Sequence, residues 1–285
     1  MSYCCNFILA DCVIAIETDF PVPISSRFEP FLTNASADFT VSFQQTASLP
    51  SLDGETLTAD DTRMALAYRQ RDQVVYALCR DSYQKAIAHV TVDYRNRRGV
   101  VRYLPGNKNR FQTMDACFDS FGLEHAMMAL DTFVVHASFI RYQGKGYLFM
   151  GPSGIGKSTA AKVWTDHTEA ELLNGDRVLV RKINGVWQGF GSPFAGSSQC
   201  HKNESASIAA VIALCREDSS FQRITPGQGF RSLYINTAVC PWDERYHSRA
   251  LNLLDAAAKE LLFYRMSAPP DERMISLMKN GLNLL

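Results

Sequence analysis

The sequence predicts an α/β protein with a smaller, β-rich part at its N-terminus. Residues 1–110 contain several alternating or mostly apolar runs that are rich in β-branched residues. Residues 111–285 alternate between strand-like and helix-like segments, and a glycine-rich turn joins one such pair. We therefore expect two parts, residues 1–110 and 111–285, with a soft boundary near residue 110.

The expected strands of the first part are short and closely spaced. They cover residues 7–17, 38–44, 73–78, 86–94 and 100–104. The last two flank the basic turn Arg95-Asn96-Arg97-Arg98-Gly99, which predicts a hairpin.

The second part mixes helices and strands. Apolar residues at helical spacing predict a helix over residues 113–130. A further helix should run from Lys157 to about Asp166, and two more should cover 243–258 and 271–279. Strands are expected at 132–142, 147–150, 170–173, 177–183, 186–190 and 208–215. Asn184-Gly185 between two apolar runs is a strong hairpin signal.

Composition narrows the classes of partner. The 285 residues carry 29 basic and 29 acidic side chains, so no net charge attracts nucleic acid or an anionic membrane. No apolar run is long enough to span a bilayer, and acidic residues interrupt the only candidate signal peptide. The eight cysteines lack zinc-site spacing and are expected to be buried thiols in a reducing compartment. We therefore expect a cytoplasmic protein without membrane or nucleic-acid partners.

The segment Gly151-Pro152-Ser153-Gly154-Ile155-Gly156-Lys157-Ser158 carries the strongest chemical signal. Its glycines let successive N–H groups point inward at phosphate oxygens, and the following helix directs its positive end at the same anion. Lys157 reaches the β- and γ-phosphates and Ser158 ligates Mg²⁺ in such loops. The alternative, a chance glycine-rich turn, is disfavoured by the strand before it and the helix after it. The expected nucleotide-binding residues are Gly151, Pro152, Ser153, Gly154, Ile155, Gly156, Lys157, Ser158 and Thr159.

The loop alone does not choose among kinases, switch GTPases and motor ATPases. The Asn-Lys-x-Asp signature of GTPases does not occur, and no run of four apolar residues ending in an acid follows the loop. These two observations favour a kinase.

Together with Asn174-Gly175-Asp176-Arg177-Val178 and His136, the loop resembles the HPr kinase/phosphorylase family over roughly residues 130–225. That family phosphorylates a serine of the sugar-transport phosphocarrier protein. Its catalytic domain has a strand with a His, a short hairpin, the loop, a helix, and an Asp-Asp pair leading into a strand. The resemblance implies a P-loop HPr-kinase-like C-terminal domain for residues 111–285.

Two departures from the family pattern change what the resemblance implies. The Asp-Asp pair is Gly175-Asp176 here, so only the second carboxylate remains. The Glu-x-Arg-Gly signature tied to phosphorylase activity is missing. The chain therefore looks more like the HPr-kinase-like proteins found with ribosomally made peptides, and residues 191–198 also resemble that subgroup.

Three residues outside the loop are candidates for the chemistry. Asp176 could hold Mg²⁺ or take a proton from the acceptor hydroxyl, and its alternative is a turn residue. His136 is either a satisfied core residue or a neighbour that tunes the carboxylate. Glu204 is either a second Mg²⁺ ligand or a solvated loop carboxylate. The expected catalytic residues are thus Asp176, His136 and Lys157, and the metal ligands Ser158, Asp176 and Glu204.

These residues predict an ATP- and Mg²⁺-dependent kinase that phosphorylates a hydroxyl, Ser or Thr, of a peptide or small protein. The N-terminal part would hold this acceptor, and a homo-oligomer is compatible with the sequence. One alternative is a nucleotide-gated binding module with little catalysis, and another is a small-molecule kinase.

Overall fold

A computed structural model of the chain describes residues 2–52, 54–60, 65–70, 73–80, 82–216 and 218–284. The chain divides into two compact units. The first contains Met1–Leu130 and Cys240–His247, and the second contains Asp131–Val239 and Ser248–Leu285. The first unit extends to residue 130, past the expected boundary near residue 110, because the two helices after residue 110 belong to it.

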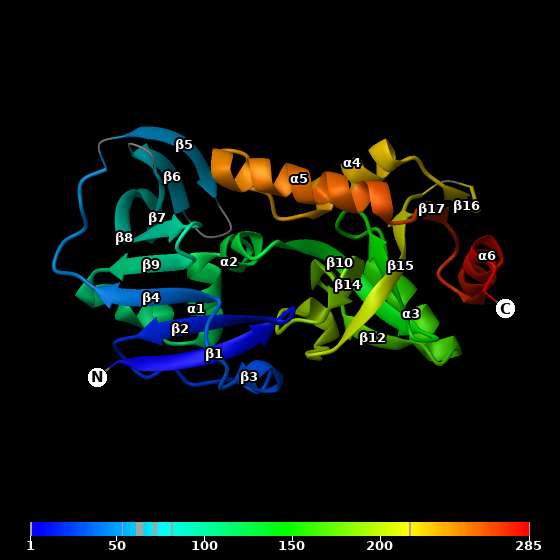
Figure 1. The fold of residues 1–285 in the computed structure, drawn as a ribbon, viewed down its shortest axis with the longest axis horizontal. Coiled ribbons are helices and arrows are strands. Elements are labelled where there is room, and N and C mark those ends of the chain that lie inside the picture. The colour runs from blue at the N-terminus through cyan, green and yellow to red at the C-terminus, as the bar shows by residue number, and fades with distance from the viewer. Residues whose placement is uncertain are drawn as a thin grey trace. The chain divides into compact units, whose positions relative to one another are not determined.

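The first unit is built on one large sheet (Figure 1). Within the described residues its strand order is β3-β1-β2-β4-β9-β8-β7-β6-β5. Most neighbours are antiparallel, and β4 pairs in parallel with both β2 and β9. The strands are β1 (Tyr3–Leu9), β2 (Cys12–Thr18), β3 (Leu32–Thr33), β4 (Phe39–Gln45), β5 (Glu55–Asp60), β6 (Ala65–Gln70), β7 (Gln73–Arg80), β8 (Ser82–Asp93) and β9 (Arg98–Tyr103).

Two short helices, α1 (Met114–Phe121) and α2 (Leu123–Ala129), complete the core of this unit. The ring of Phe118 in α1 stacks on Phe28 and meets Phe7 of β1 edge-on. The sequence predicts one continuous helix over residues 113–130. The structure breaks it at Gly122, whose φ of +86° is left-handed and ends the α-helical path. The 3₁₀ helices Glu29–Phe31 and Pro105–Phe111 also belong to this unit.

The second unit combines a mixed sheet with helices on its surface. Its strands are β10 (Thr132–Tyr142), β11 (Lys145–Met150), β12 (Glu171–Asn174), β13 (Arg177–Ile183), β14 (Val186–Phe190), β15 (Ser205–Leu214), β16 (Ser220–Arg223) and β17 (Phe263–Ser267). Its helices are α3 (Lys157–His167), α4 (Pro226–Asn236), most of α5 (Glu244–Glu260), α6 (Glu272–Leu282) and the 3₁₀ turn Gly196–Ser198.

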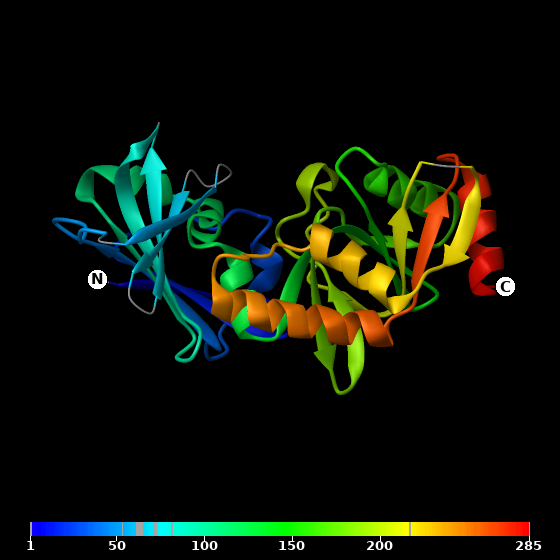
Figure 2. The ribbon, with the colours of Figure 1, turned by 90° about the horizontal axis from the view of Figure 1, so that it is seen from above.

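Strand pairing fixes which ends of these strands meet. The order is β11-β10-β13-β14-β15-β17-β16, and β11 also pairs with β15, so five of the strands close into a ring of pairings. β11, β15 and β17 run parallel, whereas β10 is antiparallel to β11 and to β13. Figure 2 shows α6 against β16 at the edge of this sheet. Because β11, β15 and β17 are parallel, their carboxyl ends lie at the same edge of the sheet.

Helix α3 covers the apolar face beside these strands. Trp164 of α3 is fully buried, and its ring packs against Tyr142 of β10 and Tyr147 of β11. Met274 and Met278 of α6 belong to the same core cluster. Since burying one large apolar side chain stabilises a fold by ~1.5–3 kcal/mol, this cluster anchors the start of α3 and the loop before it.

The α/β class expected from the sequence agrees with this mixed architecture. Strands predicted at 132–142, 177–183 and 186–190 have those bounds in the structure, and Asn184-Gly185 forms the expected hairpin turn with both φ angles positive. The hairpin with the basic tip, β8–β9, is also present. Among the described residues, no helix has the length and apolar character needed to cross a membrane.

Candidate active site

The loop Gly151–Ser158 leaves the carboxyl end of β11 and enters α3 at Lys157. Gly151, Gly154 and Gly156 have φ angles of +146°, +75° and +111°, which side chains with a Cβ rarely adopt. A Cβ at Gly154 or Gly156 would meet nothing within 4 Å. The loop thus presents backbone N–H groups and the N-terminus of α3 to open space, the arrangement that suits an anion.

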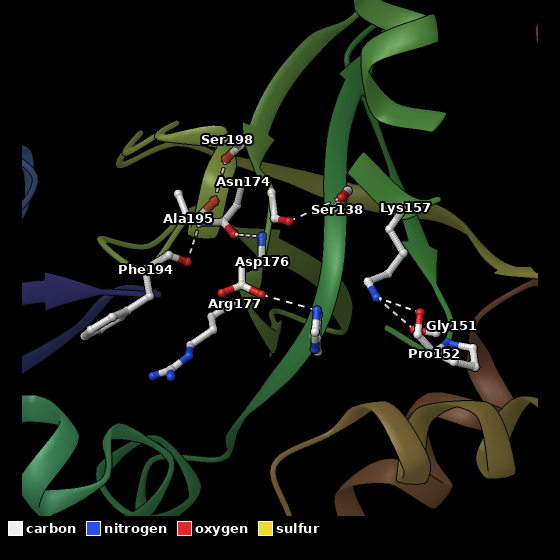
Figure 3. Close-up of polar contacts among 12 residues, drawn as sticks. Ser138, Gly151, Pro152, Lys157, Asn174, Asp176, Arg177, Phe194, Ala195 and Ser198 are labelled. Carbon is white, nitrogen blue, oxygen red and sulfur yellow. Dashed lines mark hydrogen bonds and ion pairs between the residues drawn. The ribbon is translucent and has the colours of Figure 1, made fainter. Parts of the chain in front are cut away.

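Lys157 folds back onto this loop. Its Nζ donates to the carbonyl oxygens of Gly151 at 2.9 Å and Pro152 at 3.2 Å (Figure 3). Burial lowers the pKa of the Lys157 ammonium, and the nearby Asp176 carboxylate works against that shift. The ammonium is therefore held at the start of the loop, within range of the charge of Asp176.

His136 and Asp176 meet beside the loop. His136 Nε2 lies 3.3 Å from Asp176 Oδ1, and the Asp176 side chain is 32% exposed. Burial and then the charge of Lys157 lower the pKa of His136, Asp176 opposes them, and Arg177 adds to the lowering. The His136 side chain is 52% exposed, so it is not the buried core residue that its apolar strand allowed.

Strand register explains this meeting. Ala137 of β10 pairs with Met150, the last residue of β11, so His136 lies level with Gly151. His136 also pairs with Arg177 of β13, which follows Asp176 directly. The backbone N–H of Ala137 donates to the Asp176 carbonyl at 2.9 Å. The structure therefore brings Lys157, His136 and Asp176 together from three elements.

A buried polar network holds the turn that carries Asp176. Asn174 is fully buried; its Oδ1 accepts the Asp176 N–H at 2.8 Å, and its Nδ2 donates to Ser192 Oγ at 3.2 Å. Ser192 Oγ donates in turn to the Arg177 carbonyl at 2.6 Å. The Arg177 N–H bonds to the Phe194 carbonyl at 3.1 Å. Segment 191–198 is thus tied to the turn at residues 174–177, a role for Asn174 and Ser192 that the sequence analysis missed.

The space beside Gly175 is filled by Ser198. A Cβ at residue 175 would lie 2.3 Å from Ser198 Oγ and 2.5 Å from Ser198 Cβ. A Cβ at Gly196 would lie 2.9 Å from the Cβ of Asp176. Segment 191–198 therefore packs directly on residues 175 and 176.

The structure does not bring Glu204 to this site. Glu204 precedes β15, whose first residues pair with the start of β11, whereas the loop follows the last residue of β11. Its carboxylate bonds to Arg141 at 2.6 Å, and Arg141 also bonds to Glu171. From Glu204 to the loop end of β15 is about 30 Å at ~3.3 Å per residue. Of the two acidic ligand candidates, Asp176 alone lies close enough to the loop for its charge to affect the pKa of Lys157.

The expectation of buried thiols holds for part of the cysteines. Cys12, Cys79, Cys117 and Cys240 are buried, Cys4 is exposed, and all eight are free thiols. Cys240 lies with Glu124 and His125 of the first unit, their ligand-type atoms within 4.8 Å of one another. His125 Nδ1 lies 2.8 Å from Tyr94 Oη. Cysteine spacing along the sequence could not detect this cluster, because its members lie far apart in the chain.

Comparisons with known proteins add little to this geometry. No protein-family model matches the chain, and no curated protein matches it either. Among solved structures, the HPr(Ser) kinase/phosphatase from Coxiella burnetii is similar with 12% identity and a TM-score of 0.33. The match covers 52% of this chain and 89% of that one. At this level of similarity, the function must be inferred from the residues of this chain.

Proposed function

We propose that the chain is an ATP- and Mg²⁺-dependent kinase that transfers the γ-phosphoryl group to a hydroxyl, Ser or Thr, of a peptide or small protein. The observation that carries the proposal is the juxtaposition of Asp176 and His136, 3.3 Å apart, with Lys157 and the open glycine-rich loop. Phosphoryl transfer requires these groups: a cradle for the triphosphate, a cation beside it, and a carboxylate for the acceptor.

The donor set suits a hard cation. Ser158 is exposed at the first turn of α3, and the Asp176 carboxylate is partly open to solvent. Hydroxyl and carboxylate oxygens are the ligands that Mg²⁺ prefers, so Ser158 and Asp176 would hold it. Bound there, Mg²⁺ supplies positive charge to the β- and γ-phosphate oxygens. Lys157 must exchange its bonds with Gly151 and Pro152 for bonds to phosphate when the nucleotide binds.

Asp176 would orient the acceptor hydroxyl and accept its proton while the hydroxyl oxygen bonds to the γ-phosphorus and the bond to the ADP oxygen breaks. His136 would position the carboxylate through its Nε2. Burial and the charge of Lys157 lower the pKa of His136, which favours its neutral form. Neutral His136 therefore leaves the negative charge of Asp176 in place for the metal and the proton.

One observation favours a nucleotide-gated binding module instead. With glycine at position 175 and Ser198 in the adjacent space, the site has one carboxylate where the resembling family has two. Loss of a catalytic acid with retention of the loop would leave a protein that binds ATP without transferring phosphate.

Transfer of label from γ-³²P-ATP separates these functions. Acceptors should include a Ser/Thr peptide library, the sugar-transport phosphocarrier protein and free serine and threonine. Asp176→Asn should still bind ATP through the loop and lose at least ~10²-fold in transfer, the usual scale for a positioned acid–base group. His136→Ala should lose less, and Asp166→Asn, an exposed acid paired with Lys162 on α3, is the matched control.

Full transfer by Asp176→Asn would remove the proposed role of Asp176. Wild-type protein that binds ATP but labels none of these acceptors would establish the binding module. Wild-type protein that binds no ATP would refute both functions.

A further inference from the structure

A cavity of ≈ 520 Å³ opens beside the glycine-rich loop, on the side away from Asp176. Three segments form it: loop residues 154–156, residues 214–216 at the end of β15, and residues 266–270 at the end of β17. His136, Lys157 and Asp176 do not line this cavity.

The topology explains why the cavity lies there. β11, β15 and β17 are parallel, and the pairs Met150↔Ala213 and Leu214↔Met266 bring their carboxyl ends level. In sheets of parallel strands, ligands bind in the crevice outside these ends. β10, which carries His136, flanks β11 on the other side. The loop therefore stands between the cavity and the His136–Asp176 pair.

The walls of the cavity suit a flat apolar group with polar edges. Ile155 and Leu214 supply apolar surface, and Met274 adds a thioether, which adapts to planar rings. Thr159, Ser219 and Ser267 add hydroxyls at the rim. The volume lies within the ~300–1,000 Å³ of sites that take small molecules.

Arg216 connects this cavity to the loop. Its Nη2 donates to the Gly154 carbonyl at 3.0 Å, and the residue itself lines the cavity. The bond holds the guanidinium plane at the junction of the loop and the cavity. Planar guanidinium groups stack on aromatic rings and pair with phosphate.

We propose that this cavity binds the purine base and ribose of the nucleotide whose phosphates occupy the loop, an inference that rests on the proposed function. The base lies against Ile155 and Leu214, and Arg216 stacks at its edge. The triphosphate then extends along the loop toward Lys157, so that its γ-phosphate faces the His136–Asp176 pair. The acceptor approaches from the β10 side, opposite the base.

Filling the cavity tests the assignment. Ala268 lines the cavity and is only half-buried, so Ala268→Phe should occupy the space of the base. Ala47→Phe, at an exposed position of the first unit, is the matched control. Calorimetry with Mg²⁺ should show the Kd for ATP raised at least ~10-fold by Ala268→Phe, with the Kd for inorganic tripolyphosphate changed less than about twofold.

The outcomes separate this inference from the proposed function. If the wild type binds tripolyphosphate as tightly as ATP, or if Ala268→Phe binds ATP normally, the base lies elsewhere and the inference is overturned. If the wild type binds neither ATP nor tripolyphosphate, the proposed function fails, and the base site with it.

A second measurement needs no variant. Cys215 lines the cavity and is half-buried, so its alkylation by iodoacetamide reports on occupancy. Peptide mass spectrometry should show ATP slowing Cys215 alkylation at least ~5-fold, whereas tripolyphosphate should leave the rate unchanged. Cys4, exposed in the first unit, is the internal control. Equal Cys215 rates with and without saturating ATP would overturn the assignment.

Discussion

Gly175 precedes Asp176 in the chain, and its packing makes a sharp prediction. Its backbone is not in the left-handed region, so Gly175→Ala tests space alone. The added Cβ would lie 2.3 Å from Ser198 Oγ and 2.5 Å from Ser198 Cβ, and 3.2 Å from the Ala195 carbonyl. Ser198 must move, because no real Cβ approaches heavy atoms this closely.

The expected cost follows from the contacts that move with Ser198. Its Oγ donates to the Ala195 carbonyl at 2.6 Å and accepts the Cys200 N–H at 3.3 Å. Losing two such bonds costs ~1–3 kcal/mol at ~0.5–1.5 kcal/mol each, and overpacking adds ~1–3 kcal/mol where the loop cannot yield. Since Ser198 is half-exposed and can relax, we expect Gly175→Ala to destabilise the second unit by about 1–3 kcal/mol.

Denaturant unfolding of a double-mutant series separates steric from hydrogen-bond effects. Ser198→Gly removes both clashing atoms, so Gly175→Ala should cost little in that background. Ser198→Ala keeps the Cβ that would lie at 2.5 Å, so there Gly175→Ala should still be costly. Additive free energies of unfolding in the Ser198→Gly background, or no cost of Gly175→Ala alone, would refute the packing argument.

Two further predictions concern charge. Lys157→Ala should weaken ATP binding at least ~10-fold by calorimetry and abolish transfer, because the Lys157 ammonium binds the phosphates. The control Lys162→Ala, at an exposed position on the same helix, should bind ATP normally. An unchanged ATP affinity of the folded Lys157→Ala protein would remove the nucleotide assignment. The second prediction concerns His89 of the first unit, whose pKa is lowered below 6.5 by burial and then by the charge of Arg102. Below pH 6.5 the unfolded chain therefore binds a proton at His89 that the folded chain does not bind, so the free energy of unfolding falls as the pH falls. Between pH 7.5 and 5.5 the melting temperature of His89→Gln should therefore fall less than that of the wild type, and an equal fall would refute the attribution to His89.

The sequence predicted most strongly where local chemistry decides the backbone. Asn184-Gly185 specifies a two-residue hairpin turn, and both residues have positive φ in the structure. Ala10-Asp11 also forms a two-residue turn, between β1 and β2, with φ of +52° and +56°. Because neither Ala10 nor Asp11 is glycine or asparagine, the sequence carries no signal for this turn, and residues 7–17 were expected to form one strand. Asp38 accepts the Val13 N–H beside that turn at 2.8 Å, a long-range contact that local patterns do not contain.

The buried network around Asp176 shows a second limit. Asn174 and Ser192 lie 18 residues apart and meet through side-chain hydrogen bonds inside the fold. In the sequence each is an ordinary turn or loop residue, since asparagine and serine favour turns for local reasons. Only the packing of segment 191–198 against residues 174–177 gives them a shared role. The sequence could locate Asp176 but could not identify what holds it in place.

Glu204 and Arg216 mark the same limit at the level of topology. Glu204 precedes the strand expected at residues 208–215, and Arg216 follows it. From the sequence, Glu204 was expected to be a metal ligand. That role requires the start of this strand to lie at the loop. β15 is instead parallel to β11, so its last residue, Leu214, and the next two residues, Cys215 and Arg216, lie beside the loop. Strand direction is set by pairing between distant segments, and a strand's own alternation carries no sign of it. Once that direction is known, the carboxyl-end rule selects Arg216 over Glu204 without any motif. Because β15 runs parallel to β11, the cavity that we propose for the base lies beside the loop.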